Sequence, residues 1–356
     1  MNLDKRIELI SEVGEEIITE PGLRTLLEKK AHPIAYDGFE PSGQVHIAQG
    51  LMRAINVNKM LKAGCKFNML AADWHAWANN KLGGDLEKIH TAGDFLIEVW
   101  KASEMDVKKV NFVRSSDLLA KPSYWKTVMR IARVNSVKRL TRCSQIMGRK
   151  ESEKLSGSQI LYPCMQAADI FELNADITQL GVDQRKVNVL ARETGPKLGF
   201  WKPVVVSHHM LLGLQQPKTN ATGVDRAIEL KMSKSVPDSA IFMTDSEEEV
   251  ERKINKAFCP ERQIAENPIV EYAEFLVFEK FKKIKIERPA KFGGNMELES
   301  IKELHEMYSS GQLHPMDLKK AVAGYVNKML TPVRKHFSKG KPKKILEEVK
   351  GFEITR

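Results

Sequence analysis

The chain has 356 residues, 42% of them hydrophobic, and its 56 lysines and arginines outnumber its 46 acidic residues to give a formal charge of +10. This length and apolar content exclude a disordered chain and favour two folded domains. The basic excess favours an anionic partner, such as nucleic acid, phosphate groups or a membrane surface.

The cysteines and the hydrophobic runs exclude further classes. The four cysteines, at positions 65, 143, 164 and 259, form no C-x-x-C pair, so they indicate neither a zinc site nor a redox motif. Scattered thiols are typical of a reducing compartment. The start of the chain is charged and lacks the apolar core of a signal peptide, and no apolar run reaches about 18 residues. We therefore expect a cytosolic protein without membrane attachment.

The first third of the chain alternates between helical and extended patterns. Residues 2–31 predict short amphipathic helices that are interrupted at Pro21-Gly22. After them, strands are expected over 32–39, 65–73 and 108–116, and helices over 46–64 and 85–103. Strands that alternate with helices predict a parallel sheet with right-handed crossovers.

The remaining pattern divides the chain into domains. Residues 122–150 predict basic helices without any acidic residue. The α/β pattern resumes with a strand over 175–181, a helix over 183–195 and a strand over 202–209, and a serine-capped helix is expected over 246–258. We expect an α/β protein with these parts: an N-terminal helical extension (1–31), a Rossmann-like parallel-sheet domain (32–245) with a helical insertion at about 122–158, and an all-α C-terminal domain (246–356).

The segment YDGFEPSGQVHIAQG (36–50) joins the first strand to the first crossover helix. Ligands bind at this carboxyl end of the strands in open parallel sheets. Gly38 and Gly43 permit close approach of the backbone to a bulky ligand. The helix that begins near His46 directs free amides toward the same place, which favours phosphate. Taken alone, the segment is equally well a glycine-containing turn with an ordinary histidine.

The segment KMSKS (231–235) carries two lysines that would add little stability as exposed charges. A histidine that opens the first crossover helix, followed later by KMSKS, resembles the signature pair of class I aminoacyl-tRNA synthetases. HIAQ (46–49) departs from their HIGH motif at Ala48 and Gln49, so only His46 carries over. The resemblance implies that His46, Lys231 and Lys234 are catalytic and stabilise charge on the triphosphate of ATP. It also implies that ATP is bound by Gly38, Gly43 and the other loop residues Met232, Ser233 and Ser235.

The segment ILYPCMQAADIFEL (160–173) predicts a buried helix with Pro163 in its first turn. Tyr162, Gln166 and Asp169 stand at i, i+4 and i+7 and therefore share one face. Buried polar side chains cost several kcal/mol unless they find partners. The face is therefore either a polar network between core helices or a pocket for a polar amino acid.

This face resembles the Tyr-x-x-x-Gln-x-x-Asp motif of tyrosyl-tRNA synthetases, and the chain is similar to their eukaryotic and archaeal type through most of its length. The resemblance implies that Tyr162 and Gln166 hold the ammonium group of L-tyrosine, and that Asp169 and Tyr36 hold its phenol hydroxyl. In GVDQRK (181–186), Gln184 would face the amino acid and Asp183 the ribose of ATP. In SHHMLLG (207–213), Met210 and Leu211 would flank adenine. His208 and His209 are equally well simple loop histidines.

Two C-terminal segments, KFGGN (291–295) and HPMDLK (314–319), resemble anticodon-reading motifs of the same type. Phe292 would stack on an anticodon base and Asp317 would accept a hydrogen bond from a base edge. Alternatively, Phe292 is a turn residue and Asp317 a helix N-cap. By resemblance the partners are tRNA(Tyr), L-tyrosine, ATP with its Mg²⁺, and a second copy of the chain. The helical insertion would face either the acceptor stem of the tRNA or the second copy. No metal site or protein-bound zinc is expected.

Three other functions fit part of the pattern. Tryptophanyl-tRNA synthetases share the architecture, but an indole N–H needs one acceptor and not the pair Tyr36 and Asp169. A small-molecule adenylyltransferase would not need KMSKS or a helical C-terminal domain. A non-catalytic relative would not need His46, both loop lysines and the pocket residues together. We therefore expect a two-step synthetase that forms tyrosyl-adenylate and then transfers tyrosine to tRNA.

Overall fold

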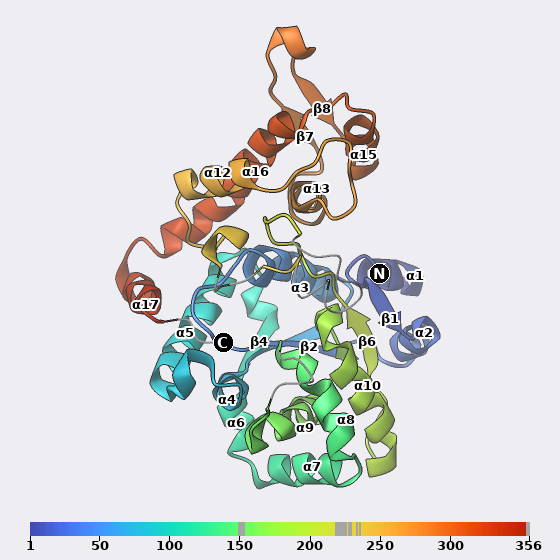
Figure 1. Ribbon diagram of the computed structural model, residues 1–356. Helices are drawn as coiled ribbons and strands as arrows, with labels where there is room; N and C mark the ends of the chain where they lie inside the picture. The colour runs from blue at the N-terminus through green and yellow to red at the C-terminus, as the bar shows by residue number, and fades with distance from the viewer. Residues whose placement is uncertain (149–153, 218–225, 227–229, 233, 235, 354–356) are drawn as a thin grey trace.

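The computed structural model describes residues 1–148, 154–217, 226, 230–232, 234 and 236–353. Figure 1 shows a helix-covered sheet in the lower part of the molecule and a mostly helical C-terminal part above it. Ser233 and Ser235 of the KMSKS segment lie outside the described residues, as does the side chain of Phe292.

The central sheet has six strands in the order β1-β6-β5-β2-β3-β4. Its strands are β1 (Glu16–Ile18), β2 (Ile34–Phe39), β3 (Lys66–Ala71), β4 (Val110–Arg114), β5 (Ile177–Thr178) and β6 (Val204–Ser207). All neighbouring pairs are parallel except β1 and β6, which are antiparallel. The strand β2 lies between β3 and β5, where the chain changes the direction in which it builds the sheet. Ligands bind in the crevice that opens at such a switch point.

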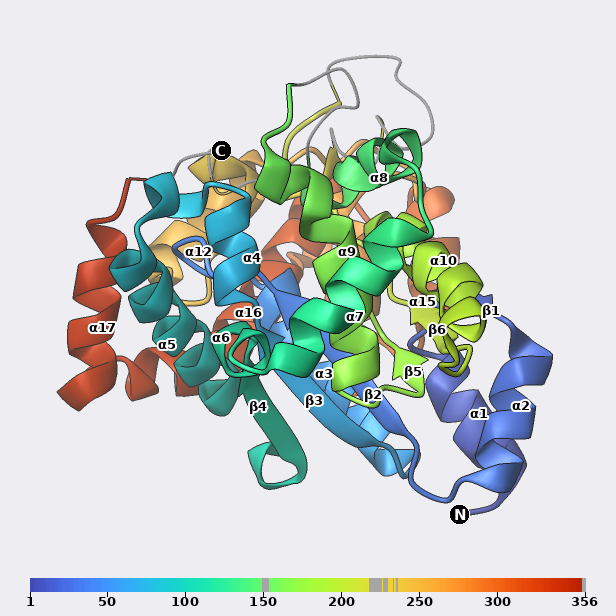
Figure 2. The same ribbon diagram turned by 90° about the horizontal axis from the view of Figure 1, so that it is seen from below.

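Helices cover both faces of the sheet. One hydrophobic core joins the sheet to α1 (Leu3–Ser11), α2 (Glu20–Lys29), α3 (Arg53–Lys62), α5 (Leu86–Ala102) and the C-terminal part. A second core joins it to α6 (Ser115–Leu119), α7 (Pro122–Arg133), α8 (Val137–Cys143), α9 (Gly157–Glu172) and α10 (Arg185–Thr194). Figure 2 shows α7 and α9 over this second face, beside the short α4 (Asp73–Ala78).

Three local expectations need correction. Pro21 and Gly22 do not interrupt a helix: they lie in the first turn of α2, which Thr19 caps, and the strand β1 separates α1 from α2. The helix expected from residue 46 begins with a π turn over Ala48–Met52 before α3. Pro163 lies inside α9, because Ser156 and Gln159 form a capping box that starts the helix earlier.

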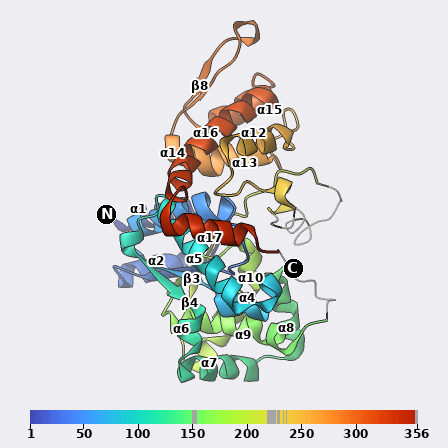
Figure 3. The same cartoon turned by 90° about the vertical axis from the view of Figure 1, so that its left-hand side faces the viewer.

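The C-terminal part is helical apart from one hairpin that the sequence did not predict. Its helices are α12 (Glu247–Lys256), α13 (Pro268–Tyr272), α14 (Glu279–Phe281), α15 (Ile301–Ser309), α16 (Pro315–His336) and α17 (Gly340–Lys350). The strands β7 (Ile284–Ile286) and β8 (Met296–Leu298) form an antiparallel pair that projects beyond the helices (Figure 3). The last helix, α17, returns to pack beside α5.

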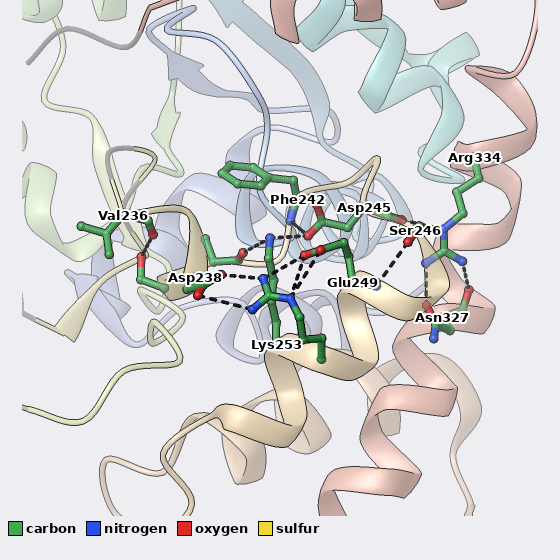
Figure 4. Close-up of polar contacts among 12 residues, drawn as sticks. Val236, Asp238, Phe242, Asp245, Ser246, Glu249, Lys253, Asn327 and Arg334 are labelled. Carbon is green, nitrogen blue, oxygen red and sulfur yellow. Dashed lines mark hydrogen bonds and ion pairs between the residues drawn. The ribbon is translucent and has the colours of Figure 1, made fainter.

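The junction near residue 245 is densely hydrogen-bonded (Figure 4). Asp245 accepts hydrogen bonds from the Lys253 ammonium at 2.7 Å and the Phe242 amide at 2.9 Å. The Arg334 Nε donates to the Asp245 carbonyl at 2.7 Å, which brings α16 to the same point. These bonds therefore fix α12 and α16 of the C-terminal part to the segment that follows KMSKS.

Candidate active site

A cavity of about 250 Å³ opens where the carboxyl ends of the parallel strands meet. It collects residues that lie far apart in the sequence, because β2, β5 and β6 all end there. All five residues expected to hold tyrosine line it: Tyr36, Tyr162, Gln166, Asp169 and Gln184. Most of the residues expected to hold ATP also line it: Gly38, His46, Asp183, Met210, Leu211, Lys231 and Met232.

Asp169 is held from two sides at the bottom of the cavity. The Tyr124 hydroxyl donates to its Oδ1 at 2.8 Å, and the His75 Nε2 lies 3.0 Å from its Oδ2. Burial lowers the pKa of His75, but the charge and hydrogen bond of Asp169 outweigh it, so the pKa is raised above its ordinary value. Neither His75 nor Tyr124 was predicted from the sequence as a site residue. His75 lies in DWHAW, just after β3, so its position at a strand end could have identified it. No motif or spacing in the sequence points to Tyr124.

The hydroxyl of Tyr36 is buried and makes no hydrogen bond to any described residue. Burial, followed by the charges of Asp169 and Asp37, raises the pKa of this phenol well above its ordinary value, and the nearby Gln166 side chain lowers it only in part. An unpaired buried hydroxyl costs free energy. A ligand that supplies a polar group in this part of the cavity would remove that cost.

Tyr162 and Gln166 are each tied to a neighbouring side chain. The Tyr162 hydroxyl donates to Glu40 Oε1 at 2.7 Å, and Glu40 also accepts from the Asn79 amide at 3.0 Å. The Gln166 amide donates to Gln184 Oε1 at 3.1 Å. Glu40 lines the cavity and was not predicted from the sequence, although it directly follows β2. Together these groups give this side of the cavity an acidic, hydrogen-bonding wall.

Lys234 of the KMSKS segment lies against the turn that follows β2. The Lys234 ammonium donates to Ser42 Oγ at 3.0 Å. Burial, then the charge of Lys81, lowers the pKa of Lys234 to about 7. His46 is partly exposed, like Lys234, and the loss of water around it, followed by the charges of Lys234 and Lys231, lowers its pKa to about 3. The imidazole is therefore neutral at neutral pH, beside two lysines.

Lys234 and Gly43 do not line the cavity themselves. Gly43 has a φ of +101°, a conformation that side-chain-bearing residues rarely adopt, so it shapes the turn. Gly181 contributes by its small size: a Cβ there would lie 2.6 Å from Met210 Sδ and 2.7 Å from Asp183 Oδ1. This close packing holds together the two loops that follow β5 and β6.

A buried ion pair supports the same strand end. The Arg53 Nη1 lies 2.8 Å from Asp37 Oδ2, and the two side chains are 0% and 2% exposed. Arg53 also donates to Gln179, and the His208 Nε2 lies 3.6 Å from Asp37. The sequence analysis did not identify this pair, because nothing in the local pattern distinguishes Arg53 from a surface residue of an amphipathic helix.

The two residues expected to read RNA lie away from the cavity. Asp317 is in the first turn of α16 and is not its N-cap, because His314 occupies that position. Phe292 belongs to the turn between β7 and β8, and its side chain lies outside the described residues. The Arg288 Nη1 donates to the Gln312 carbonyl at 2.8 Å, which connects this hairpin to the loop before α16.

Two general expectations concern metals and membranes. The described residues contain no group of three or more His, Cys, Asp or Glu side chains arranged to hold a metal ion. None of the helices in the described part of the chain combines the length and apolar character needed to cross a bilayer.

Comparisons with known proteins agree with this geometry. A family profile described as "tRNA synthetases class I (W and Y)" matches residues 28–331. The cytoplasmic tyrosine–tRNA ligase 1 of Arabidopsis thaliana is 50% identical over 358 residues, which cover 99% of this chain and 90% of that enzyme.

Solved structures show the same relationship. The tyrosyl-tRNA synthetase of Pyrococcus horikoshii, complexed with L-tyrosine, superposes with a TM-score of 0.91 at 39% identity and covers 98% of this chain and all of that one. That of Leishmania major, in complex with tyrosinol, gives a TM-score of 0.89 at 44% identity, covering 98% of this chain and 60% of that chain. The chain therefore belongs to the class I tRNA synthetases of the tryptophan and tyrosine family, in the tyrosyl branch of eukaryotic and archaeal type.

Proposed function

We propose that the chain is a tyrosine–tRNA ligase of the cytoplasm, which activates L-tyrosine with ATP and transfers it to tRNA(Tyr). The observation that supports this function most directly is the pair of polar groups at the bottom of the cavity. There the Tyr36 hydroxyl lacks a partner among the described residues, and Asp169, fixed by His75 and Tyr124, lines the same space. A phenol hydroxyl, which donates one hydrogen bond and accepts another, complements this pair.

The same pair would select tyrosine over phenylalanine. Phenylalanine lacks only the hydroxyl, so its binding would leave the Tyr36 hydroxyl buried without a partner and would give Asp169 no donor from the ligand. Tyrosyl-tRNA synthetases are the standing example of discrimination by this cost. In the proposal, Tyr162 and Gln166 hold the ammonium group and Gln184 faces the amino acid, with Glu40 as the acidic group behind Tyr162.

The reaction has two steps. The tyrosine carboxylate attacks the α-phosphorus of ATP, which forms tyrosyl-adenylate and releases pyrophosphate. The terminal ribose hydroxyl of the tRNA then attacks the activated carbonyl and releases AMP. Neither step needs a protein nucleophile, so catalysis comes from positioning and from stabilisation of charge.

The charge-stabilising groups are His46, Lys231 and Lys234 in this proposal. His46, with its pKa lowered to about 3, acts as a neutral hydrogen-bonding group. The triphosphate would favour the charged form of Lys234, whose pKa is about 7 without it. Met210 and Leu211 flank adenine, Asp183 faces the ribose, and Gly38 and Gly43 shape the turn below the nucleotide. Mg²⁺ enters on the ATP phosphates.

We propose residues 32–245 as the catalytic domain and 246–356 as the anticodon-binding domain. Asp317 lies at the start of α16, connected through Arg288 to the hairpin that carries Phe292. We expect Phe292 to stack on an anticodon base and Asp317 to accept a hydrogen bond from a base edge. Unpaired bases are commonly read in this way.

A second copy of the chain is the proposed partner of the helical insertion. Four large apolar side chains on and between α7 and α8 are exposed: Trp125 (41%), Met129 (59%), Val134 (44%) and Val137 (63%). An apolar patch of this kind marks an interaction surface. The proposed homodimer would cover it.

Exchange of labelled pyrophosphate into ATP tests the function. Each proteinogenic amino acid is added singly to the purified chain, and tyrosine alone should support exchange. Exchange with tryptophan instead would show that the cavity reads an indole, and exchange with no amino acid would remove the synthetase assignment. Charging of tRNA(Tyr) transcripts then measures the second step.

A further inference from the structure

His209 stands between two carboxylates that are far apart in the sequence, Glu15 and Glu271. Its Nδ1 lies 2.8 Å from Glu15 Oε2, just before β1, and its Nε2 lies 3.0 Å from Glu271 Oε2 on α13. Its ring stacks on Phe275 with centroids 4.3 Å apart and an angle of 12°. Ionised carboxylates only accept hydrogen bonds, so both ring nitrogens must donate. Only the imidazolium form of histidine does this.

The segment that carries His209 is the one expected to flank adenine. His209 lines the cavity together with Met210 and Leu211. The next residue, Leu212, is held by the same helix: its amide donates to Glu271 at 3.1 Å, and its carbonyl accepts from the Tyr272 hydroxyl at 3.0 Å. Helix α13 therefore fixes both ends of the short segment 209–212.

This segment also positions the first lysine of KMSKS. Leu212 forms a β-bridge with Lys231, and the amide of Gly213 donates to the Leu230 carbonyl at 2.6 Å. A displacement of 209–212 would therefore move the adenine wall and Lys231 together. The residues proposed to hold tyrosine lie on β2, on α9 and after β5. The His209 ring nitrogens contact Glu15 and Glu271 and none of these residues.

We propose that His209 is a positioning residue for ATP: held as an imidazolium ion between Glu15 and Glu271, it makes the placement of the adenine-flanking segment depend on helix α13 of the C-terminal part. This inference rests on the proposed function, because it takes 209–212 as part of the nucleotide site. It goes beyond that function by giving the C-terminal part a role in ATP binding that needs no RNA.

The charge environment of His209 is consistent with this role. The charged and titratable groups that face it are Glu15 from the segment before β1, Glu271 from α13, and the neighbouring His208, whose Nδ1 lies 2.9 Å from the His209 carbonyl. Burial lowers the pKa of His209, but the two carboxylates outweigh it and raise the pKa to about 9. The ion pairs therefore persist at neutral pH and are lost as the pH rises through about 9.

The test is the variant His209→Gln in the full chain, assayed by tyrosine-dependent pyrophosphate exchange without tRNA. The KM for ATP should rise about 5- to 10-fold, a usual size for coupling between sites, while the KM for tyrosine stays within about 2-fold. His209→Arg keeps a cation that can reach both carboxylates and should restore most of the ATP affinity. Glu271→Gln should act like His209→Gln, and the double variant should be little worse than either single one.

His336→Gln is the matched control. His336 also joins the C-terminal part to the catalytic part, with its Nε2 2.7 Å from Glu98 Oε2 on α5, but it does not line the cavity. It should leave the KM for ATP unchanged. An equal rise in both variants would reduce the effect to a general loosening of the two parts and overturn the proposal. So would an unchanged KM for ATP in His209→Gln, or an equal effect on ATP and tyrosine.

Direct titration of ATP by calorimetry separates this inference from the proposed function. If the wild-type chain binds ATP but supports no exchange with tyrosine, the proposed function is wrong. The ratio of ATP dissociation constants between His209→Gln and wild type would still decide the role of His209. This ratio should shrink as the pH is raised through about 9, because His209 of the wild type then loses its charge.

Discussion

The His75 Nε2 and the Asp169 Oδ2 lie 3.0 Å apart below the cavity, and each side chain is only 1% exposed. A buried charged pair of this kind is costly to form and more costly to break, because removal of one partner leaves the other uncompensated. The pair thus fixes the carboxylate in place before any ligand arrives. Tyr124 completes the arrangement by occupying the second carboxylate oxygen at 2.8 Å.

Replacement of Asp169 by asparagine should lower kcat/KM for tyrosine by about 10- to 100-fold, because a hydrogen bond to a charged group is lost. Steady-state pyrophosphate exchange with varied tyrosine measures this. Glu172→Gln is the matched control, since Glu172 lies on the same helix but contacts Thr127 outside the cavity. Unaltered tyrosine kinetics in Asp169→Asn would place the phenol elsewhere.

His75→Gln should destabilise the fold in a pH-dependent way. The folded-state pKa of His75 is raised above 6.5, so its protonated form contributes stability that is fully present below pH 6.5 and is lost as the pH rises through the folded-state pKa. The difference in unfolding free energy between wild type and variant should therefore be larger at about pH 6 than at about pH 9. Urea denaturation at both values measures it, and a difference that grows with pH would contradict the assignment.

ATP binding should take up protons at neutral pH. Lys234 has a pKa lowered to about 7, so part of it is neutral in the free protein near that pH, and the triphosphate should restore its charge. Calorimetry in two buffers with different ionisation enthalpies counts these protons. Lys234→Arg should abolish the uptake, because arginine remains charged. Equal uptake in both proteins would assign the protons to another group.

Arg53→Met should lower the free energy of unfolding by about 3–5 kcal/mol, because Asp37 would remain buried without its partner. Arg24→Met is the control: the Arg24 side chain is 51% exposed and pairs with an exposed Asp4, so its loss should cost no more than about 1 kcal/mol. Similar losses in the two variants would mean that Asp37 finds compensation elsewhere. Both are measured by urea denaturation.

Met129→Glu should convert a dimer into a monomer, because a charge would be buried in the proposed interface on α7. Sedimentation velocity at micromolar concentration measures the state of the protein. Met316→Glu changes another exposed methionine, on α16, and should leave the dimer intact. A wild-type chain that sediments as a monomer would contradict the proposed homodimer through the helical insertion.

Local pattern predicted much of the sheet and one face of the site. The alternation of strands and helices located β2, β3 and β4 and the crossover helices between them, because apolar periodicity reports which face of an element is buried. The spacing of Tyr162, Gln166 and Asp169 placed them together on α9, and all three line the cavity. The strands β1, β7 and β8 were not predicted, because each of them has only three residues and depends on its pairing partner.

By itself, the sequence determined the order of the α/β elements, the shared face of α9 and the presence of the His46 and KMSKS motifs. These depend on residues close together in the chain or on motifs of fixed wording. Only the tertiary structure decided that His75 and Tyr124 hold Asp169, that Arg53 neutralises Asp37, and that His209 joins Glu15 to Glu271. The reason is physical: a charge or hydroxyl acquires its role from the burial and partners that folding gives it, and for His75, Tyr124 and His209 those partners come from distant parts of the chain.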